Sequence, residues 1–282
     1  MSQTIRAMAG IPVFLALATM ATLATARASD VHVANVDEIA RDVEAVPCDN
    51  AQRLPAVRSL YEKAGATPSN IRIDAYRDYG GVENLVVVKP GDSPETIVIG
   101  AHYDKAGDGC GAVDNWSGQV AVTQLYRTMR DLQTSKTLVF VAFGREENGL
   151  VGSRAMVQAI PREALPQYCW MINIDSLGLS RPQVADNMST KPLERLAADV
   201  AKEMGIPFSH ASLTRAYSDS NAFMGKKIPA ITIHGLDNNW TQVLHRREDQ
   251  AAKVDAASVY LGYRLALSMV ARLDQAPCGA YR

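Results

Sequence analysis

Three largely apolar runs constrain what this chain can fold into more than any other feature of its sequence. They occupy residues 96–101, 138–143 and 169–174, and they are rich in β-branched and aromatic side chains. Strands that alternate apolar and polar residues have one face in water, whereas continuous apolar runs are typical of strands buried on both faces of a parallel sheet. The three runs therefore predict the central strands of a sheet that is covered on both sides.

Segments with a helical spacing of apolar residues separate these runs from one another and from three further predicted strands. The further strands are expected at residues 71–76, 84–88 and 228–233. Helices are expected from residue 36 onward and at residues 51–64, 117–132, 150–160, 191–204 and 251–273. Because strands alternate with helices, we predict the α/β class, as a three-layer αβα sandwich with a mixed, largely parallel central sheet.

The composition excludes several classes of protein. The chain has 282 residues, of which 47% are hydrophobic and 21% charged, so it is neither collagen-like nor broadly disordered. Its 29 basic and 30 acidic residues give a net charge of -1 without a basic run, and no nucleic-acid partner is expected. No internal repeat or Pro/Ser-rich linker divides the chain, which favours a single catalytic domain at residues 29–282.

The first 28 residues have the pattern of a cleaved secretory signal peptide. They contain Arg6, an apolar run at residues 11–23 and no acidic residue, and small residues precede cleavage sites after Ala26 or Ala28. An uncleaved membrane anchor is the alternative, but the run is short for a membrane span. We therefore expect a secreted or periplasmic protein with no stable membrane insertion after cleavage. Cleavage after Ala28 would change the net charge from -1 to -3.

An exported chain keeps its disulfides, because they persist in oxidising compartments. The four cysteines, Cys48, Cys110, Cys169 and Cys278, allow three pairings, and none has the spacing of a zinc-binding CxxC pair. The sequence cannot choose among these pairings. A Cys48–Cys278 bridge is weakly favoured, because terminal helices often pack together.

Polar side chains follow each central run where the predicted strand ends. His102 and Asp104 follow the first run, Glu146 and Glu147 follow the second, and Asp175 follows the third. In open α/β sheets, ligands bind beyond the carboxyl ends of the strands. We therefore expect these side chains to meet at one edge of the sheet.

Two further residues are candidates to join them: Asp114, in a glycine-bearing loop, and His245, before the last helix. Singly, each of these residues could be a core histidine, a helix cap, a turn residue or a surface residue, but their coincidence at matching positions favours a site. Crowded carboxylates repel one another unless a cation lies between them. Imidazole and carboxylate ligands without thiolate suit zinc and related metals. Because the carboxylates exceed what one catalytic zinc needs, we predict two metal ions that share a bridging carboxylate.

These residues and their neighbours resemble the zinc aminopeptidases of the M28 metallopeptidase family. The matching segments are AHYD (101–104), GAVDNWSG (111–118), EENGLVGS (146–153), NID (173–175) and YSD (217–219), with His245 and Asp249. Each segment alone is a weak signal, but their common order and spacing, over roughly residues 86–273, make a strong one. The resemblance implies the zinc-aminopeptidase fold.

The resemblance also implies the metal ligands. Asp114 would bridge two Zn²⁺ ions, or two other divalent ions. His102 and Asp175 would complete one metal site. Glu147 and His245 would complete the other.

Three further features follow from the same resemblance. Glu146 would be the general base that acts on the water between the metal ions. Asp104 would orient the imidazole ring of His102 without itself binding a metal ion. The peptide bond after the bridging aspartate is often cis in the family, so Asp114–Asn115 is expected to be cis.

The substrate pocket is less well defined. Tyr217, as a possible oxyanion-stabilising group, and Asp219 are candidates for substrate binding. Ser176 and Ser220 stand where many members of the family carry Met and His. These departures leave the side-chain preference open.

Together these features predict an exported di-zinc aminopeptidase that acts on peptides with a free N-terminus. The alternatives are a single-zinc glutaminyl cyclase or a carboxypeptidase of the same fold, or a non-catalytic binding domain. A cyclase would bind one metal ion and would not hydrolyse aminoacyl amides. The oligomeric state is not predicted.

Overall fold

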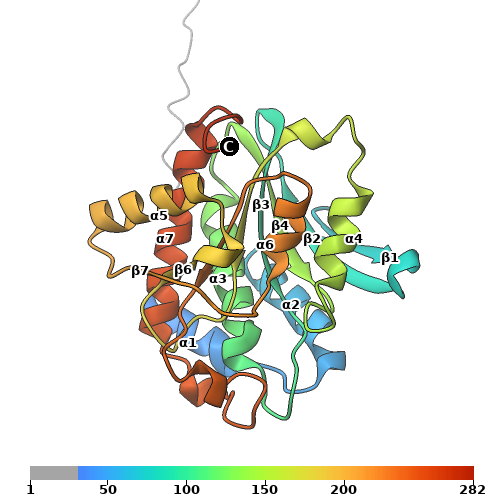
Figure 1. The fold of residues 1–282 in the computed structure, drawn as a ribbon. Helices are drawn as coiled ribbons and strands as arrows, with labels where there is room; N and C mark the ends of the chain where they lie inside the picture. The colour runs from blue at the N-terminus through green and yellow to red at the C-terminus, as the bar shows by residue number, and fades with distance from the viewer. Residues whose placement is uncertain (1–30) are drawn as a thin grey trace, which may run out of the picture. The chain divides into compact units, whose positions relative to one another are not determined.

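The structure is a computed structural model that describes residues 31–282, so the predicted signal peptide lies outside the described residues. Figure 1 shows the arrangement of the helices and strands. The strands are β1 (Ile71–Tyr76), β2 (Val82–Lys89), β3 (Ser93–His102), β4 (Lys136–Phe143), β5 (Tyr168–Ile174), β6 (Gln183–Ala185), β7 (Ser209–Ala211) and β8 (Ala230–His234). The helices are α1 (Val36–Glu44), α2 (Asn50–Lys63), α3 (Ser117–Met129), α4 (Val151–Ala159), α5 (Lys191–Met204), α6 (Asp219–Gly225) and α7 (Ala256–Gln275).

All of these strands belong to one mixed sheet. Its order is β1-β2-β4-β3-β5-β8-β6-β7. The central strands β4, β3, β5 and β8 are parallel, β1 and β2 add antiparallel strands at one side, and β6 joins β8 antiparallel at the other. The prediction of a largely parallel central sheet is therefore confirmed.

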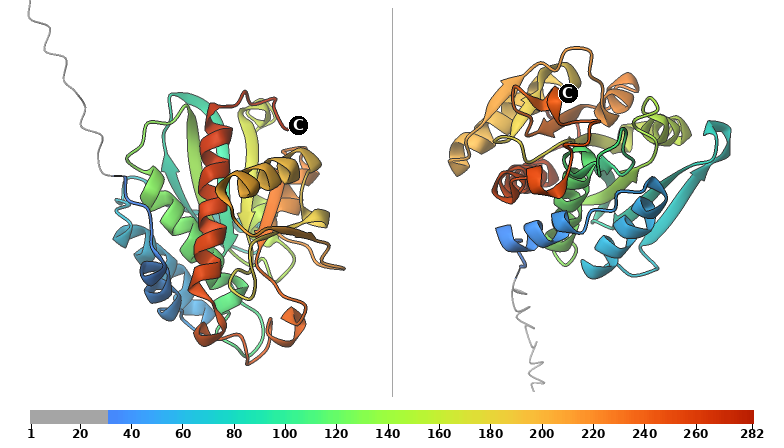
Figure 2. Two further views of the ribbon diagram at one scale, coloured as in Figure 1. Left: turned by 90° about the vertical axis from the view of Figure 1, so that its left-hand side faces the viewer. Right: turned by 90° about the horizontal axis from the view of Figure 1, so that it is seen from below.

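Two layers of helices cover this sheet, as the α/β prediction requires. Helices α1, α2, α3, α5 and α7 pack on one face, and α4 and α6 pack on the other. Figure 2 (left) shows α7, the long red helix, crossing that first face. The predicted three-layer αβα sandwich is confirmed.

Alternate residues of the central strands point into two different cores. In β3, Ile97 and Ile99 belong to the cluster under α1, α3 and α7, whereas Val98 belongs to the cluster under α4 and α6. In β4, Phe140 belongs to the first of these clusters and Val141 belongs to the second. Because each face of each strand is buried, both sets of positions are apolar, and this explains the continuous runs in the sequence.

The carboxyl ends of the parallel strands meet at one edge. His102, the last residue of β3, lies beside Phe143, the last residue of β4, and Ile174 of β5 lies beside Ile233 of β8. The segment between β8 and α7 lies at the lower end of the molecule in Figure 1, and Figure 2 (right) views the molecule from that side. This edge carries the polar residues singled out in the sequence.

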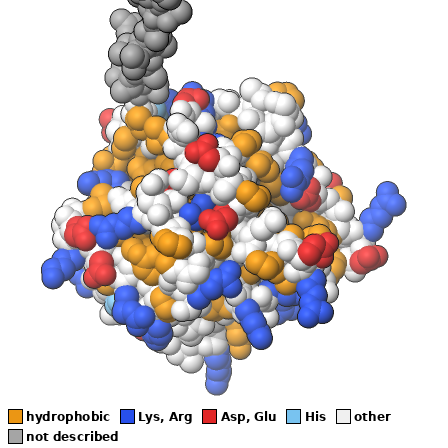
Figure 3. Space-filling view, turned by 90° about the horizontal axis from the view of Figure 1, so that it is seen from above, with side chains coloured by type: hydrophobic (Ala, Val, Ile, Leu, Met, Phe, Trp, Pro, Cys, Tyr) orange, Lys and Arg blue, Asp and Glu red, His pale blue; other side chains and the backbone are white. Residues whose placement is uncertain are grey.

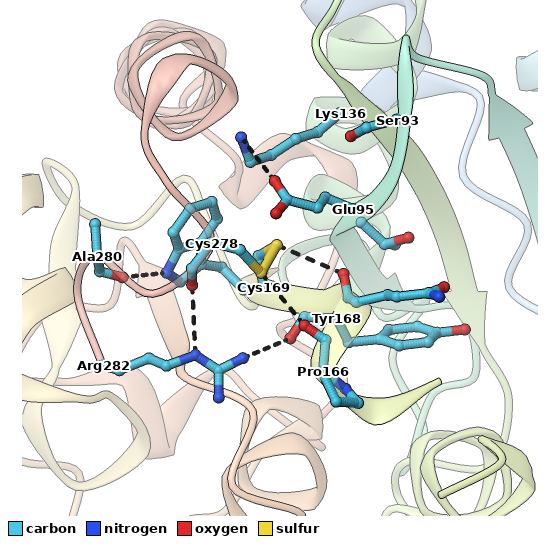
Figure 4. The surroundings of a disulfide bond; sticks show 12 residues. Ser93, Glu95, Lys136, Pro166, Tyr168, Cys169, Cys278, Ala280 and Arg282 are labelled. Carbon is cyan, nitrogen blue, oxygen red and sulfur yellow. Dashed lines mark hydrogen bonds and ion pairs between the residues drawn. A yellow bond between two sulfur atoms is a disulfide. The ribbon is translucent and has the colours of Figure 1, made fainter. Parts of the chain in front are cut away.

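The cysteines pair as Cys48–Cys110 and Cys169–Cys278, so the Cys48–Cys278 prediction is wrong. Helix α7 has 20 residues and is about 30 Å long. It carries Cys278 away from the edge where Cys48 and Cys110 lie and toward the start of β5. Figure 4 shows Cys278 against Cys169, and the Trp170 indole donates a hydrogen bond to the carbonyl oxygen of Ala280 at 3.0 Å. The two bridges therefore anchor opposite ends of the fold.

The end of the molecule that carries the C-terminus has a mixed surface. On the face in Figure 3, Lys and Arg side chains are scattered among acidic and hydrophobic ones and do not form a continuous basic stripe. Among residues 31–282, no helix combines the length and the apolar character needed to cross a membrane.

The elements that the sequence did not predict are short. Strands β6 and β7 have three residues each, and α6 has seven. Such segments contain too few residues to display a hydrophobic period.

Candidate metal centre

The five predicted metal ligands come together at the carboxyl edge of the sheet, with Asp114 between two histidines. Oδ1 of Asp114 lies 3.1 Å from Nε2 of His102, and Oδ2 lies 3.1 Å from Nε2 of His245. His102 ends β3, Asp114 precedes α3, and His245 lies in the segment before α7. The two oxygens of one carboxylate therefore face two separate groups of side chains.

One further carboxylate completes each group. Oδ1 of Asp175 lies 3.5 Å from Nε2 of His102, and Oε2 of Glu147 lies 3.0 Å from Nε2 of His245. The side chain of His102 is 2% exposed and that of His245 is 53% exposed. One group is therefore deep in the protein, and the other is open to solvent.

The electrostatics of the protein alone indicate a shortage of positive charge. Burial raises the pKa of Glu146 well above its usual range, and the charges of Asp175 and Asp219 add to the effect. Hydrogen bonds to Asp114 and Glu147 raise the pKa of His245 to about 10. These carboxylates thus draw protons onto the site, which divalent cations would replace.

The donor atoms fit zinc. Ligand atoms of His102, Asp114 and Glu147 all lie within 4.8 Å of one another. Each group offers one imidazole nitrogen and carboxylate oxygens, which zinc accepts as ligands. The arrangement can accommodate two ions that share Asp114.

Asp104 supports this site in a different way from that expected. Nδ1 of His102 lies 3.1 Å from the backbone carbonyl oxygen of Asp104, but 3.7 Å from its carboxylate. The carboxylate instead accepts hydrogen bonds from the backbone N–H groups of Glu146, at 2.9 Å, and Glu147, at 3.2 Å. Asp104 thus holds His102 through its main chain and both glutamates through its side chain.

The backbone of Asp114 is held by Asp249, whose side chain is 1% exposed. Its carboxylate accepts hydrogen bonds from the N–H groups of Val113, at 2.7 Å, and Asp114, at 3.2 Å. The Asp114–Asn115 peptide is cis, so this prediction is confirmed. Asp249 belonged to the matching segments in the sequence, but its contact with the loop of Asp114 was not predicted.

Asn115 joins the loop of Asp114 to the end of β5, and Ser218, which precedes α6, contacts Asp175. The side-chain oxygen of Asn115 accepts a hydrogen bond from the N–H of Ser176 at 3.0 Å, and its amide group donates to the carbonyl oxygen of Ile174 at 2.9 Å. The hydroxyl of Ser218 donates to Oδ2 of Asp175. Asn115 thus holds the backbone on either side of Asp175, and Ser218 holds its carboxylate.

Arg53 is a buried cation behind the site that the sequence analysis missed. Its side chain is fully buried, and its guanidinium donates to the carbonyl oxygens of Tyr103, of Cys110 at 2.7 Å and of Gly111 at 3.1 Å. It also lies 5.5 Å from the centroid of the Trp116 ring. Burial lowers the pKa of Arg53 to about 10, although nearby carboxylates oppose this shift, so the group stays charged at neutral pH. The sequence did contain a signal for this residue, because Arg53 lies on the same buried face of α2 as Val57, where a charged residue is unexpected.

A cavity of about 450 Å³ opens beside these residues. Glu146 lines it, and so does Tyr217, which is 71% exposed. Asp219 is fully buried and is not among the residues that line the cavity. Of the two candidates for substrate binding, the structure therefore brings only Tyr217 to the cavity.

Comparisons with known proteins agree with this geometry. Residues 84–270 match the model of peptidase family M28. The chain is 26% identical over 231 residues to leupeptin-inactivating enzyme 1 of Streptomyces exfoliatus, a match that covers 78% of this chain and 52% of that protein. The chain thus spans about half the length of this curated relative.

Two solved structures show the same fold. A zinc aminopeptidase from Bacillus subtilis superposes with a TM-score of 0.62 at 22% identity, covering 70% of this chain and 52% of that one. A glutaminyl cyclase from an Acidobacteriales bacterium superposes with a TM-score of 0.70 at 18% identity, covering 88% of this chain and 98% of that one. At these identities the likeness establishes the fold.

Proposed function

The chain belongs to peptidase family M28, and we propose that it is an aminopeptidase that binds two zinc ions and removes N-terminal residues from peptides. The observation that carries the proposal is the position of the Asp114 carboxylate. Its two oxygens each lie 3.1 Å from the Nε2 atom of a different histidine. A single metal ion would leave one of these groups without a cation.

In this proposal, His102, Asp114 and Asp175 hold one zinc ion, and Asp114, Glu147 and His245 hold the other. When bound, the two ions supply Lewis acidity, which lowers the pKa of water and polarises the carbonyl group of the substrate. The ligands on the protein side are held by Asp104, Asp249 and the other contacts described above. Such support orients ligands and tunes their affinity for metal.

Glu146 is the proposed general base. It lines the cavity, and the hydrogen bond from its N–H group to Asp104 fixes the backbone from which its side chain extends. Its carboxylate can take a proton from the attacking water and pass that proton to the leaving amine. The neighbouring Glu147 is turned toward His245 and is committed to metal binding, so the two glutamates have different tasks.

The crowded carboxylates also favour substrates with a free amino terminus. Glu146, Asp114, Glu147 and Asp175 line the cavity and present acceptors to an α-amino group. An acetylated terminus has no basic amine and would lose this interaction. We propose that Tyr217 contacts the substrate from the exposed side of the cavity, and that buried Asp219 acts indirectly by raising the pKa of Glu146.

We further propose that residues 1–28 are a signal peptide, that residues 29–282 form one catalytic domain, and that the protein works outside the cytoplasm. The two disulfides support this location, because such bonds persist in oxidising compartments.

A single-zinc glutaminyl cyclase is the second candidate, because the fold matches a cyclase over nearly the whole of that chain. The two functions differ in product. A peptidase releases the free N-terminal amino acid, whereas a cyclase releases ammonia and leaves the peptide bond intact.

A panel of aminoacyl 4-nitroanilides tests the proposal. The zinc-loaded protein is expected to release nitroaniline from substrates with a free amino group and not from their N-acetylated counterparts. Release from both sets, or ammonia release from glutaminyl peptides without cleavage, would contradict it.

A further inference from the structure

The wall of the cavity next to Asp175 contains a buried histidine, His234, that plays no part in the proposed metal site. His234 is the last residue of β8, and Asp175 follows the last residue of the adjacent β5. The N–H of Asp175 donates to the carbonyl oxygen of Ile233 at 2.9 Å, so Asp175 and His234 occupy neighbouring positions on the two strands. His234 is 1% exposed and lines the cavity.

The alternation of β8 explains why a polar residue can occupy this position. Ile231 and Ile233 belong to the core under α1, α3 and α7, whereas Thr232 and His234 line the cavity. Side chains of consecutive strand residues point to opposite faces of a sheet. The polar pair thus belongs to the cavity and not to the hydrophobic core.

The hydrogen bonds of His234 determine which ring nitrogen carries the proton. Nδ1 accepts a hydrogen bond from the N–H of Leu236 at 3.2 Å, so the proton of the neutral ring is on Nε2. Burial lowers the pKa of His234 to about 4, although the charges of Asp175 and Asp186 oppose this shift, so the ring is neutral at physiological pH. Nε2 has no hydrogen-bond partner among residues 31–282. A buried N–H group without a partner is unfavourable, because it has lost its hydrogen bond to water.

Ser176 supplies the complementary group. It is 2% exposed, lines the same cavity, and donates its hydroxyl hydrogen to Oδ1 of Asp175 at 3.1 Å. A serine hydroxyl that has donated its hydrogen still has two lone pairs that can accept. The wall of the cavity thus contains one unpaired donor, Nε2 of His234, and one acceptor, Oγ of Ser176. Met188 and Leu213 give the same cavity apolar lining.

We propose that His234 and Ser176 select substrates whose N-terminal residue carries a side-chain carboxamide, namely glutamine or asparagine. The carboxamide oxygen accepts from Nε2 of His234, and its NH₂ group donates to Oγ of Ser176. This inference rests on the proposed function, because it assumes that the N-terminal side chain enters this part of the cavity. Met188 and Leu213 then cover its methylene groups.

Other side chains fit these two groups less well. Methionine and leucine leave the N–H of His234 unpaired. A carboxylate cannot donate to Ser176. Arg154 and Arg215 also line the cavity, but both are exposed, where solvent screens their attraction for an acidic side chain.

The test compares kcat/KM of the zinc-loaded protein for Gln, Asn, Glu, Met and Leu 4-nitroanilides. Glutamine is expected to exceed methionine, which has nearly the same size, by about 10-fold or more. His234→Leu is expected to bring that ratio close to one, and His234→Gln, which keeps a donor, to restore part of it. His210→Leu is the matched control, because it replaces a histidine that does not line the cavity. Zinc content and Tm of each variant show that the fold and the metal site are intact.

A second measurement separates failure of this inference from failure of the proposed function. Calorimetric binding of free L-glutamine and L-methionine does not require turnover, and glutamine is expected to bind more tightly unless His234 is replaced by Leu. If no nitroanilide is cleaved but this selectivity is present, the proposed function fails and the inference stands. If methionine or leucine equals glutamine in both assays, or if His234→Leu leaves the ratio unchanged, the inference is wrong.

Discussion

Asp104 holds the backbone of Glu146: its carboxylate accepts the N–H of Glu146 at 2.9 Å and that of the next residue, Glu147, at 3.2 Å. One side chain at the end of β3 thereby sets the position of two residues that follow β4. The proposed general base and a proposed metal ligand share this support. A change at Asp104 should therefore affect both metal binding and turnover.

Asp104→Asn replaces one of these two accepting oxygens by an NH₂ group, which cannot accept. We expect zinc affinity or kcat to fall by about 10- to 100-fold, as is typical when a group that orients metal ligands is lost. Zinc competition with a chelator and steady-state kinetics measure the two effects. Asp131→Asn, at an exposed position, is the control. Unchanged zinc affinity and unchanged kcat in Asp104→Asn would contradict this role.

Arg53 predicts a link between α2 and the metal site. Arg53→Lys cannot supply the several N–H groups that now reach the carbonyl oxygens of Tyr103, Cys110 and Gly111. The variant is expected to have a lower Tm and a zinc affinity reduced by about 10-fold. Arg58→Lys, on the exposed face of the same helix, should leave both unchanged. Equal behaviour of the two variants would show that Arg53 does not support the site.

The adjacent glutamates should have separable effects. Glu146→Gln is expected to retain zinc but to lower kcat by about 10²- to 10⁴-fold, because the general base is lost. Glu147→Gln is expected to weaken the binding of one of the two proposed zinc ions, because its carboxylate is a proposed ligand. Metal analysis and kinetics on the two variants test this division. Retained activity in Glu146→Gln would show that another group accepts the proton.

The metal-free protein should depend on pH through His245. The folded state raises the pKa of His245 to about 10 from an ordinary value of 6.5, because Asp114 and Glu147 accept its hydrogen bonds. A raised pKa stabilises the fold fully below pH 6.5, and that stabilisation is lost as the pH rises through about 10. Urea unfolding of chelator-treated protein between these values should show the loss.

His245→Ala should reduce this pH dependence, and His210→Ala, outside the metal centre, should retain it in full. Some dependence should remain in His245→Ala, because, although burial opposes the shift, the charge of Glu146 and hydrogen bonds to neighbouring carboxylates also raise the pKa of His102 well above its usual range. Zinc-loaded protein should lose less stability over the same range, because metal ions replace the protons. A pH dependence as large in His245→Ala as in the unaltered protein would assign it to other groups.

The central strands were predictable from the sequence because burial on both faces leaves a continuous apolar run. The edge strand β1 and helix α5 were predictable from the spacing of their apolar residues. β1 and α5 have the predicted bounds, Ile71–Tyr76 and Lys191–Met204. The candidate ligands were found for a related reason, since parallel strands deliver their terminal residues to one edge. In both cases the prediction rested on residues that are close together in the sequence.

The remaining features depend on contacts between distant segments. Arg53 meets Gly111 across 58 positions in the sequence, and Cys169 meets Cys278 across 109. His234 follows the strand predicted at residues 228–233 and was not singled out in the sequence, because neither its unpaired Nε2 nor the cavity leaves a local pattern. Such pairings leave no local period in the sequence. Sequence reasoning therefore found the candidate ligands that the fold brings together, but it missed the groups that hold them and the groups that line the cavity beside them.

The number of zinc ions bound to each chain tests the central claim most directly. Metal analysis of purified protein, reconstituted with zinc and freed of excess, is expected to find two ions per chain. His245→Ala should reduce that number to one, because His102 and Asp175 still complete the buried site with Asp114. One ion per chain in the unaltered protein, with none lost in His245→Ala, would contradict a pair of metal ions bridged by Asp114.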